Sequence, residues 1–180
     1  QQYEITVVPL SVQFGSETFR DGVDISKDAF YQRLTQPGQV MPTTSQPSLG
    51  DFEAVYRRLT ADGSTVVSLH LHPKFSGTIR AAQQAAQLVG EDKVQVIDSG
   101  QIVMGLGFIA IEVVKALREG QSIDQIRELV RSLSDRTYLY VGLDTLHYLQ
   151  QGGRIGRTRA FLGSLLSVKP IIFVKDGEPQ

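Results

Sequence analysis

Apolar residues recur along this chain with two periods, and the period changes from one segment to the next. Short β-branched runs alternate with longer segments whose apolar residues return every three or four positions, which is the repeat of a helix. The predicted strands span 5–12, 65–71 and 93–97, with a loop and short strand at 14–25, and the predicted helices span about 26–34, 48–59, 77–89, 103–118 and 122–133. This order predicts an α/β fold with a largely parallel sheet and helices on both faces.

Serine residues mark where most of these helices should begin. A serine hydroxyl accepts hydrogen bonds from the free amides of a first helical turn. The serines at the predicted starts are Ser26, Ser48, Ser76 and Ser122. Asp51 and Gln125 follow two of them by three residues, which is the spacing of a capping box. Ile25 and Phe30 flank the first start at the spacing of a hydrophobic staple.

The pattern changes near residue 136. A strand is predicted over 137–142, a short helix from Asp144 to about 151, a helix over 158–166 and a strand over 170–174, followed by a hairpin turn at 176–177. We therefore expect an α/β domain over residues 1–135 and the start of a smaller second α/β domain over 136–180. Because this hairpin and the first strand leave unpaired edges, we expect a part of a longer protein; dimerisation is the alternative.

Composition narrows the classes of function. The chain has 180 residues with 18 Lys and Arg against 19 Asp and Glu, so a net charge of −1 provides no field for nucleic acid or an anionic membrane. Cysteine is absent, which excludes disulfides and thiolate chemistry. The longest apolar stretch, 102–114, is too short for a bilayer, and no secretory signal pattern opens the chain, so we expect a cytoplasmic protein.

Two hydroxyl-rich segments are candidates for binding an anion. Thr44 and Ser45 lie in the proline-punctuated segment 42–48, where hydroxyls and loop amides suit a carboxylate or phosphate. Ser76, Gly77 and Thr78 open a predicted helix, whose free amides favour a negative group. The alternative is that the hydroxyls of both segments serve only local turns and helix caps.

A glycine-flanked arginine and two histidines are further candidates. Arg154 in the segment 152–157 suits a bidentate grip on a carboxylate, or is a solvated residue after a helix end. Together with Arg157 and Arg159 it makes a basic patch too small for nucleic acid. His70 and His72 share one strand face and are open to phosphate transfer, metal binding or a structural role, although the sequence suggests no third metal ligand.

Three segments taken together resemble the DegV family. They are Thr44-Ser-Gln-Pro47, Phe75-Ser-Gly-Thr78 and Gly152-Gly-Arg-Ile-Gly156. Further matches in the family's order are 5–10, 21–22, 96–99, 144–149, 162–166 and 169–170. The resemblance covers essentially the whole chain. It departs at His72-Pro73, where the family commonly has two serines, and it lacks the family's first segment and the second half of its second domain.

The resemblance implies a bacterial protein that binds one long-chain fatty acid and presents it to a separate fatty acid kinase subunit, which forms the acyl phosphate. It implies that Thr44 and Ser76 bind the carboxylate with Arg154 beside it, that Ser45 is an addition, and that Gly77 and Thr78 are possible further contacts. No catalytic residue, cofactor, metal or membrane insertion is expected. Two alternatives stay open: phosphate transfer through His70 or His72, and a serine hydrolase that uses Ser76, although its G-x-S-x-G motif is absent. The apolar segment 104–111 is either core or the lining of a lipid tunnel.

Overall fold

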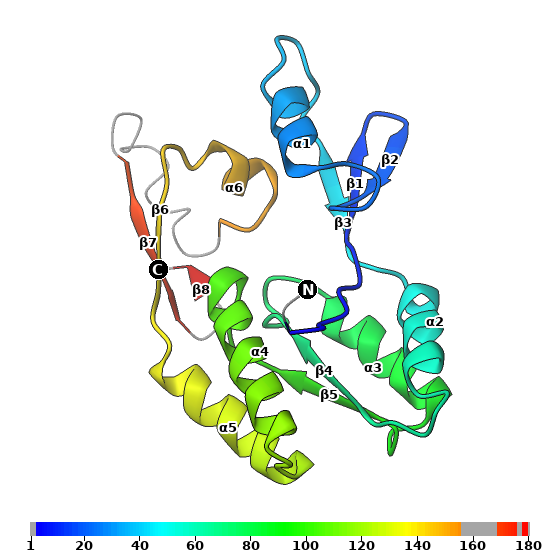
Figure 1. The fold of residues 1–180 in the computed structure, drawn as a ribbon. Coiled ribbons are helices and arrows are strands. Elements are labelled where there is room, and N and C mark those ends of the chain that lie inside the picture. Colours follow the sequence, from blue (N-terminus) through cyan, green and yellow to red (C-terminus); the bar gives the residue numbers. More distant parts are fainter. Residues whose placement is uncertain (1–2, 156–168, 176–177, 180) are drawn as a thin grey trace.

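The computed structural model describes residues 3–155, 169–175 and 178–179, and Figure 1 shows their arrangement. The N-terminal elements are β1 (Ser11–Phe14), β2 (Glu17–Arg20), α1 (Lys27–Leu34), β3 (Thr43–Ser45), α2 (Leu49–Leu59), β4 (Val66–His70) and α3 (Thr78–Val89). They are followed by β5 (Val94–Asp98), α4 (Val103–Arg118), α5 (Ile123–Arg136), β6 (Leu139–Gly142), α6 (His147–Gln151), β7 (Ile171–Lys175) and β8 (Glu178–Pro179). The predicted helix 158–166 lies outside the described residues.

A parallel pair of strands forms the centre of the larger layer. β4 and β5 run in register from Val66 opposite Val94 to His70 opposite Asp98. Because successive side chains of a strand point to opposite faces, the pair offers apolar residues to both sides. Figure 1 shows α2 and α3 on one side of this pair and α4 and α5 on the other. The predicted placement of helices on both faces is confirmed.

Each face of the pair has its own apolar cluster. Val66, Val94 and Val96 pack with the α2 and α3 residues Phe52, Tyr56, Ala81, Ala82, Ala85 and Ala86. Val67, Leu69 and Ile97 pack with the α4 and α5 residues Ile109, Val113, Ala116, Ile126 and Val130. The alternation along each strand therefore fixes which helices cover which face.

A small antiparallel sheet of order β2-β1-β3 adds a second unit that the sequence pattern did not predict as a sheet. Val12 and Phe14 pack on it with Ile25, and Phe30 of α1 joins the same cluster. Ser26 Oγ accepts from Ala29 N–H at 3.2 Å, which confirms the predicted cap, and the staple residues Ile25 and Phe30 pack in the same apolar cluster.

The predicted strand at 5–12 is wrong over most of its length. Residues 4–10 have no regular secondary structure, and β1 begins only at Ser11. The side chains of Ile5 and Val7 are 44% and 78% exposed. A strand needs a hydrogen-bonding neighbour, and within the described residues no strand pairs with 5–10.

The C-terminal elements form an antiparallel sheet of order β6-β7-β8. β7 pairs with β8 through Lys175 and Glu178, which confirms the predicted hairpin, although its turn at 176–177 lies outside the described residues. The expected absence of a return strand is wrong, since the two-residue β8 pairs with the end of β7. Asp144 does not cap α6: the helix begins at His147 after Leu146, and Asp144 Oδ1 instead lies 2.6 Å from Lys169 Nζ. The domain boundary near 135 stays a prediction.

Helix length bears on membrane association. Among the described residues α4 is the longest helix, with 16 residues, and no helix there is long and apolar enough to cross a bilayer.

Candidate functional site

The first hydroxyl-rich segment joins a strand edge to a helix start. β3 pairs with β1 through Val12 and Thr44, and both Thr44 and Ser45 are exposed. Ser48 forms the predicted capping box, since its Oγ accepts from Asp51 N–H at 3.1 Å while Asp51 Oδ2 accepts from Ser48 N–H at 2.8 Å. Ser48 therefore serves α2, whereas the hydroxyls of Thr44 and Ser45 make no hydrogen bond within the described residues.

The second segment begins α3 in a way that the sequence reasoning did not predict. The N-cap is Gly77, and Ser76 stands one residue before it. Ser76 Oγ accepts from Thr78 N–H at 3.3 Å and lies 2.7 Å from Thr78 Oγ1, which is a local serine turn. Gly77 has no side chain with which to cap α3, no acidic residue lies in the first turn, and the Ser76 hydroxyl satisfies only the Thr78 amide. The positive end of its dipole is therefore not neutralised from within the helix.

These two segments lie against each other at Gly77. A Cβ atom placed on Gly77 would lie 2.5 Å from Gln46 Oε1, which is closer than side-chain carbons approach other atoms. Only glycine therefore allows the Gln46 amide to lie against the start of α3 in this way. The segment that carries Thr44 and Ser45 thus ends beside the segment that carries Ser76 and Thr78.

Arg154 belongs to the turn after α6. Its backbone N–H donates to Leu149 O at 3.0 Å, and its Nη1 donates to Gly152 O at 2.6 Å, so the guanidinium folds back on the glycine turn. Arg154 is exposed. Among the described residues no hydrogen bond or ion pair joins it to the hydroxyls of Thr44 or Ser76. Its place beside them stays a prediction, and Arg157 and Arg159 lie outside the described residues.

The two histidines have different surroundings. His70 is only 5% exposed, its Nε2 lies 2.8 Å from Ser68 Oγ, and Phe52 packs edge-on against its ring. Burial lowers the pKa of His70 to about 4, against an opposing effect of Asp98. His72 is half-buried, and its Nδ1 accepts from Lys74 N–H at 3.2 Å. A buried neutral ring favours the structural role for His70 over a phosphate acceptor.

Metal ligands do not gather in the described part of the chain, where no group of three or more His, Asp or Glu side chains could hold an ion. Neither histidine is hydrogen-bonded to Ser76 there either, since His70 binds Ser68 and His72 binds a backbone amide. A serine hydrolase needs a base within hydrogen-bond reach of its nucleophile. The geometry therefore gives the hydrolase alternative no support.

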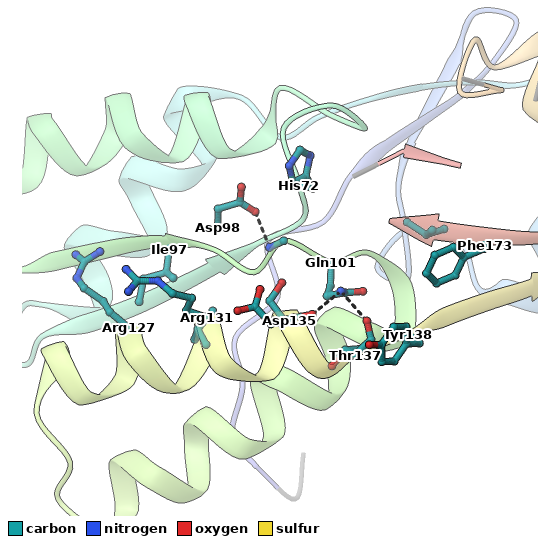
Figure 2. A pocket seen from close by; sticks show the side chains of 14 residues that line it. His72, Ile97, Asp98, Gln101, Arg127, Arg131, Asp135, Thr137, Tyr138 and Phe173 are labelled. Carbon is teal, nitrogen blue, oxygen red and sulfur yellow. Dashed lines mark hydrogen bonds between the residues drawn. The ribbon is translucent and has the colours of Figure 1, made fainter. Parts of the chain in front are cut away.

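A cavity of about 630 Å³ lies where β5 ends, bordered by α5, by Thr137 and Tyr138 just before β6, and by β7. Figure 2 shows its charged side chains, among them Asp98, Arg127, Arg131 and Asp135. None of the predicted hydroxyl residues lines it; His72 is the lining residue nearest to them in the sequence. Sequence reasoning missed this cavity, because its residues come from β5, α5, β7 and the loops near them and form no motif.

Gln101 holds one wall of the cavity in place. Its Nε2 donates to Ser134 O and Thr137 O, both at 3.2 Å, while its buried Oε1 has no partner within the described residues. Gly105 makes room for this side chain, since a Cβ there would lie 2.8 Å from Gln101 Oε1.

Ile109 is buried in the core while Phe108 is 60% exposed, so the apolar segment 104–111 serves in part as core.

Comparison with known sequences supports the resemblance. The family described as "Uncharacterised protein, DegV family" matches residues 1–180. A DegV domain-containing protein of Streptococcus pyogenes is 39% identical over 97% of this chain and 62% of its own length. A DegV domain-containing protein of Streptococcus pneumoniae is 36% identical over 100% of this chain and 64% of its own length. The chain thus spans slightly less than two thirds of these relatives.

Comparison with solved structures confirms the predicted α/β fold class. A DegV family protein from Thermus thermophilus, described for its fatty acid binding, has a TM-score of 0.91 at 36% identity, over 99% of this chain and 63% of its own. A stearic acid-binding protein from Eubacterium ventriosum has a TM-score of 0.91 at 35% identity, over 99% of this chain and 62% of its own. With a family match along its whole length and this agreement in fold, the chain belongs to the DegV family.

Proposed function

We propose that this protein binds one long-chain fatty acid and holds its carboxylate where the segments 44–48 and 76–78 meet. The observation that supports the proposal is the close approach of Gln46 to Gly77, which brings the segment that carries Thr44 and Ser45 to the start of α3, where no acidic residue lies in the first turn. Hydroxyls and free amides are good donors to a carboxylate. Thr44 and Ser76 are the proposed ligands, Ser45 and Thr78 are additions, and Arg154 supplies a positive charge beside them. The fatty acid binding described for the relatives supports the ligand class.

The acyl chain and the carboxylate of the ligand contribute different amounts of binding free energy. Burial of a methylene group stabilises by about 0.8 kcal/mol, so about fourteen methylenes contribute on the order of 11 kcal/mol before the costs of ordering. A hydrogen bond to a charged group contributes about 1.5–3 kcal/mol. The acyl chain therefore determines affinity, and the hydroxyls determine which end of the lipid lies at the junction.

The carboxylate end stays accessible in this arrangement, because Thr44, Ser45 and Arg154 are all exposed. A kinase subunit needs such access to transfer a phosphoryl group to the acid. We therefore propose that the protein presents the carboxylate to a separate kinase and acts as the binding subunit. Every catalytic group is assigned to that partner.

Native mass spectrometry of the protein purified from cells tests the binding itself. We expect a bound mass in the range of long-chain acids, and the same acid in a solvent extract. Failure to recover lipid, together with failure to take up added palmitate, would overturn the proposed function.

The role of Ser76 is tested by comparing palmitate with the matching alcohol, hexadecanol. Ser76→Ala should weaken palmitate binding about tenfold or more, because a hydrogen bond to a charged group is lost, and should change hexadecanol binding less. Ser64→Ala is a matched control, since Ser64 is exposed and lies beyond the end of α2. Equal losses for acid and alcohol would contradict the carboxylate role.

Gly77→Ala tests the junction of the two segments. The new methyl group should displace the Gln46 amide, which is the mobile end of a side chain, so the free energy of unfolding should fall by no more than about 1 kcal/mol while palmitate binding weakens several-fold. Gly50→Ala is the control, because a Cβ there would meet only Ser48 Oγ at 3.8 Å. Urea unfolding and palmitate titration of both variants provide the measurement. Unchanged palmitate affinity in Gly77→Ala would argue against the junction as the head-group site.

A further inference from the structure

A series of side-chain hydrogen bonds joins α2 to β4. Tyr56 of α2, Ser68 of β4 and His70 at the end of β4 are joined in that order, with 2.7 Å between Tyr56 Oη and Ser68 Oγ and 2.8 Å between Ser68 Oγ and His70 Nε2. Tyr56 and His70 are 2% and 5% exposed. Three polar side chains in one apolar layer need a reason, because each costs free energy when it is buried without a partner.

The direction of each hydrogen bond in this series can be assigned. The Tyr56 hydroxyl has one proton, and Ser68 Oγ is its only hydrogen-bond partner among the described residues. A buried hydroxyl proton without an acceptor is costly, so Tyr56 donates to Ser68. The Ser68 proton then goes to His70 Nε2. A neutral imidazole that accepts at Nε2 carries its proton on Nδ1.

The series of hydrogen bonds ends at the Nδ1–H donor of His70. His70 Nδ1 has no hydrogen-bond partner within the described ranges, although the ring is held firmly: Phe52 packs on it, and Ser99 donates from its N–H at 3.0 Å and from its Oγ at 2.8 Å to the His70 carbonyl. His70 is the last residue of β4, at the edge of the sheet from which the Ser76 segment leaves. Ligands of α/β sheets bind at this carboxyl edge.

We infer that Nδ1–H of His70 is a further hydrogen-bond donor to the anionic head group held at Ser76 and Thr44, and that Tyr56 and Ser68 are positioning residues that fix the ring in this tautomer. This inference rests on the proposed function. The charged group that acts on the ring is Asp98 of β5, and Tyr56 of α2 reaches the ring through Ser68. Burial keeps the ring neutral at physiological pH, so that the donor is present without a net charge.

The tautomer is read from long-range ¹H–¹⁵N correlation spectra of the lipid-free chain, with His70→Gln used to assign the signal. We expect the proton of His70 on Nδ1, and we expect Tyr56→Phe to raise the Nε2–H population because Ser68 then loses its donor. A proton on Nε2 in the unsubstituted chain would overturn the inference. Because no lipid is present, this result does not depend on the proposed function.

Palmitate titration tests the donor itself. An asparagine amide lies near the position of Nδ1 and a glutamine amide near that of Nε2, so His70→Gln should weaken palmitate binding about tenfold and His70→Asn less. His147→Gln on exposed α6 is the control. Equal losses in the two His70 variants, or an Nδ1–H signal that palmitate leaves unchanged, would overturn the donor role alone. Failure of the unsubstituted chain to bind palmitate would overturn the proposed function, and the ligand of His70 with it.

Discussion

Replacement of Ile126 by alanine is expected to lower the free energy of unfolding by about 2–5 kcal/mol. Ile126 is fully buried where α5 packs on α4 and β5, among Ile109, Val113 and Val130. The substitution removes apolar area from the core and leaves a cavity that close-packed neighbours fill only in part. Urea unfolding followed by far-UV circular dichroism measures the loss.

Ile171→Ala is the matched control, since it makes the same chemical change at a side chain that is 73% exposed. Its effect should stay below about 1 kcal/mol. Equal losses at the two positions would contradict the packing of α5 against α4 and β5.

Acidification should destabilise the protein well before its carboxylates protonate. The unfolded pKa of His70 is 6.5 and its folded pKa is about 4, so between these values the unfolded state binds the additional proton. Stability is therefore complete above pH 6.5 and is lost as the pH falls towards 4. The loss should be about 2 kcal/mol at pH 5 relative to pH 7.5, approaching about 3 kcal/mol near pH 4.

His70→Gln separates this effect from other titrations. The substituted protein should be less stable at neutral pH, but its free energy of unfolding should fall much less between pH 6.5 and 5. Asp24, whose pKa is lowered to about 2 by its hydrogen bonds from Arg20, contributes only below this window, from pH 3.8 downwards. The comparison is made by urea unfolding of both proteins at several pH values. The same decline in the variant would show that His70 is not its cause.

Local signals predicted most of the helices. α4 spans the predicted residues, and the capping boxes at Ser48 and Ser122 form as expected, because each depends on side chains only three residues apart. The carboxyl ends of β4 and β5, at His70 and Asp98, lie within one residue of the predicted ends. Such elements contain their own start signals and apolar repeat, so their neighbours need not be known.

The errors fall where a distant partner decides the structure. The β-branched residues at 5–10 read as a strand, but strand formation requires a neighbour that the sequence pattern does not identify. β3 was not predicted within its proline-containing segment, because it depends on pairing with β1, which brings together residues about 30 positions apart. At the start of α3, Ser76 has the sequence of a cap, yet its hydroxyl is used in a tighter local turn with Thr78.

The candidate site was predicted as residues and not as geometry. The segments around Thr44 and Ser76 could be selected from their hydroxyls, but their contact through Gln46 depends on the packing of α2 against α3. The order Tyr56, Ser68, His70 has no sequence signature, because it crosses from a helix to a strand. Arg154 was selected from its glycine neighbours, and its relation to the hydroxyls stays a prediction.

The close contact between Gly77 and Gln46 links two positions that are far apart in the chain. A homologue that acquires a side chain at 77 must turn the Gln46 amide aside, carry a shorter residue at 46 or move the segment before α2, so the two positions should vary together during evolution. Glycine at 77 leaves room for a long polar residue at 46, whereas alanine at 77 should coincide with serine or alanine there. Covariation across a deep set of homologous sequences would show this dependence directly.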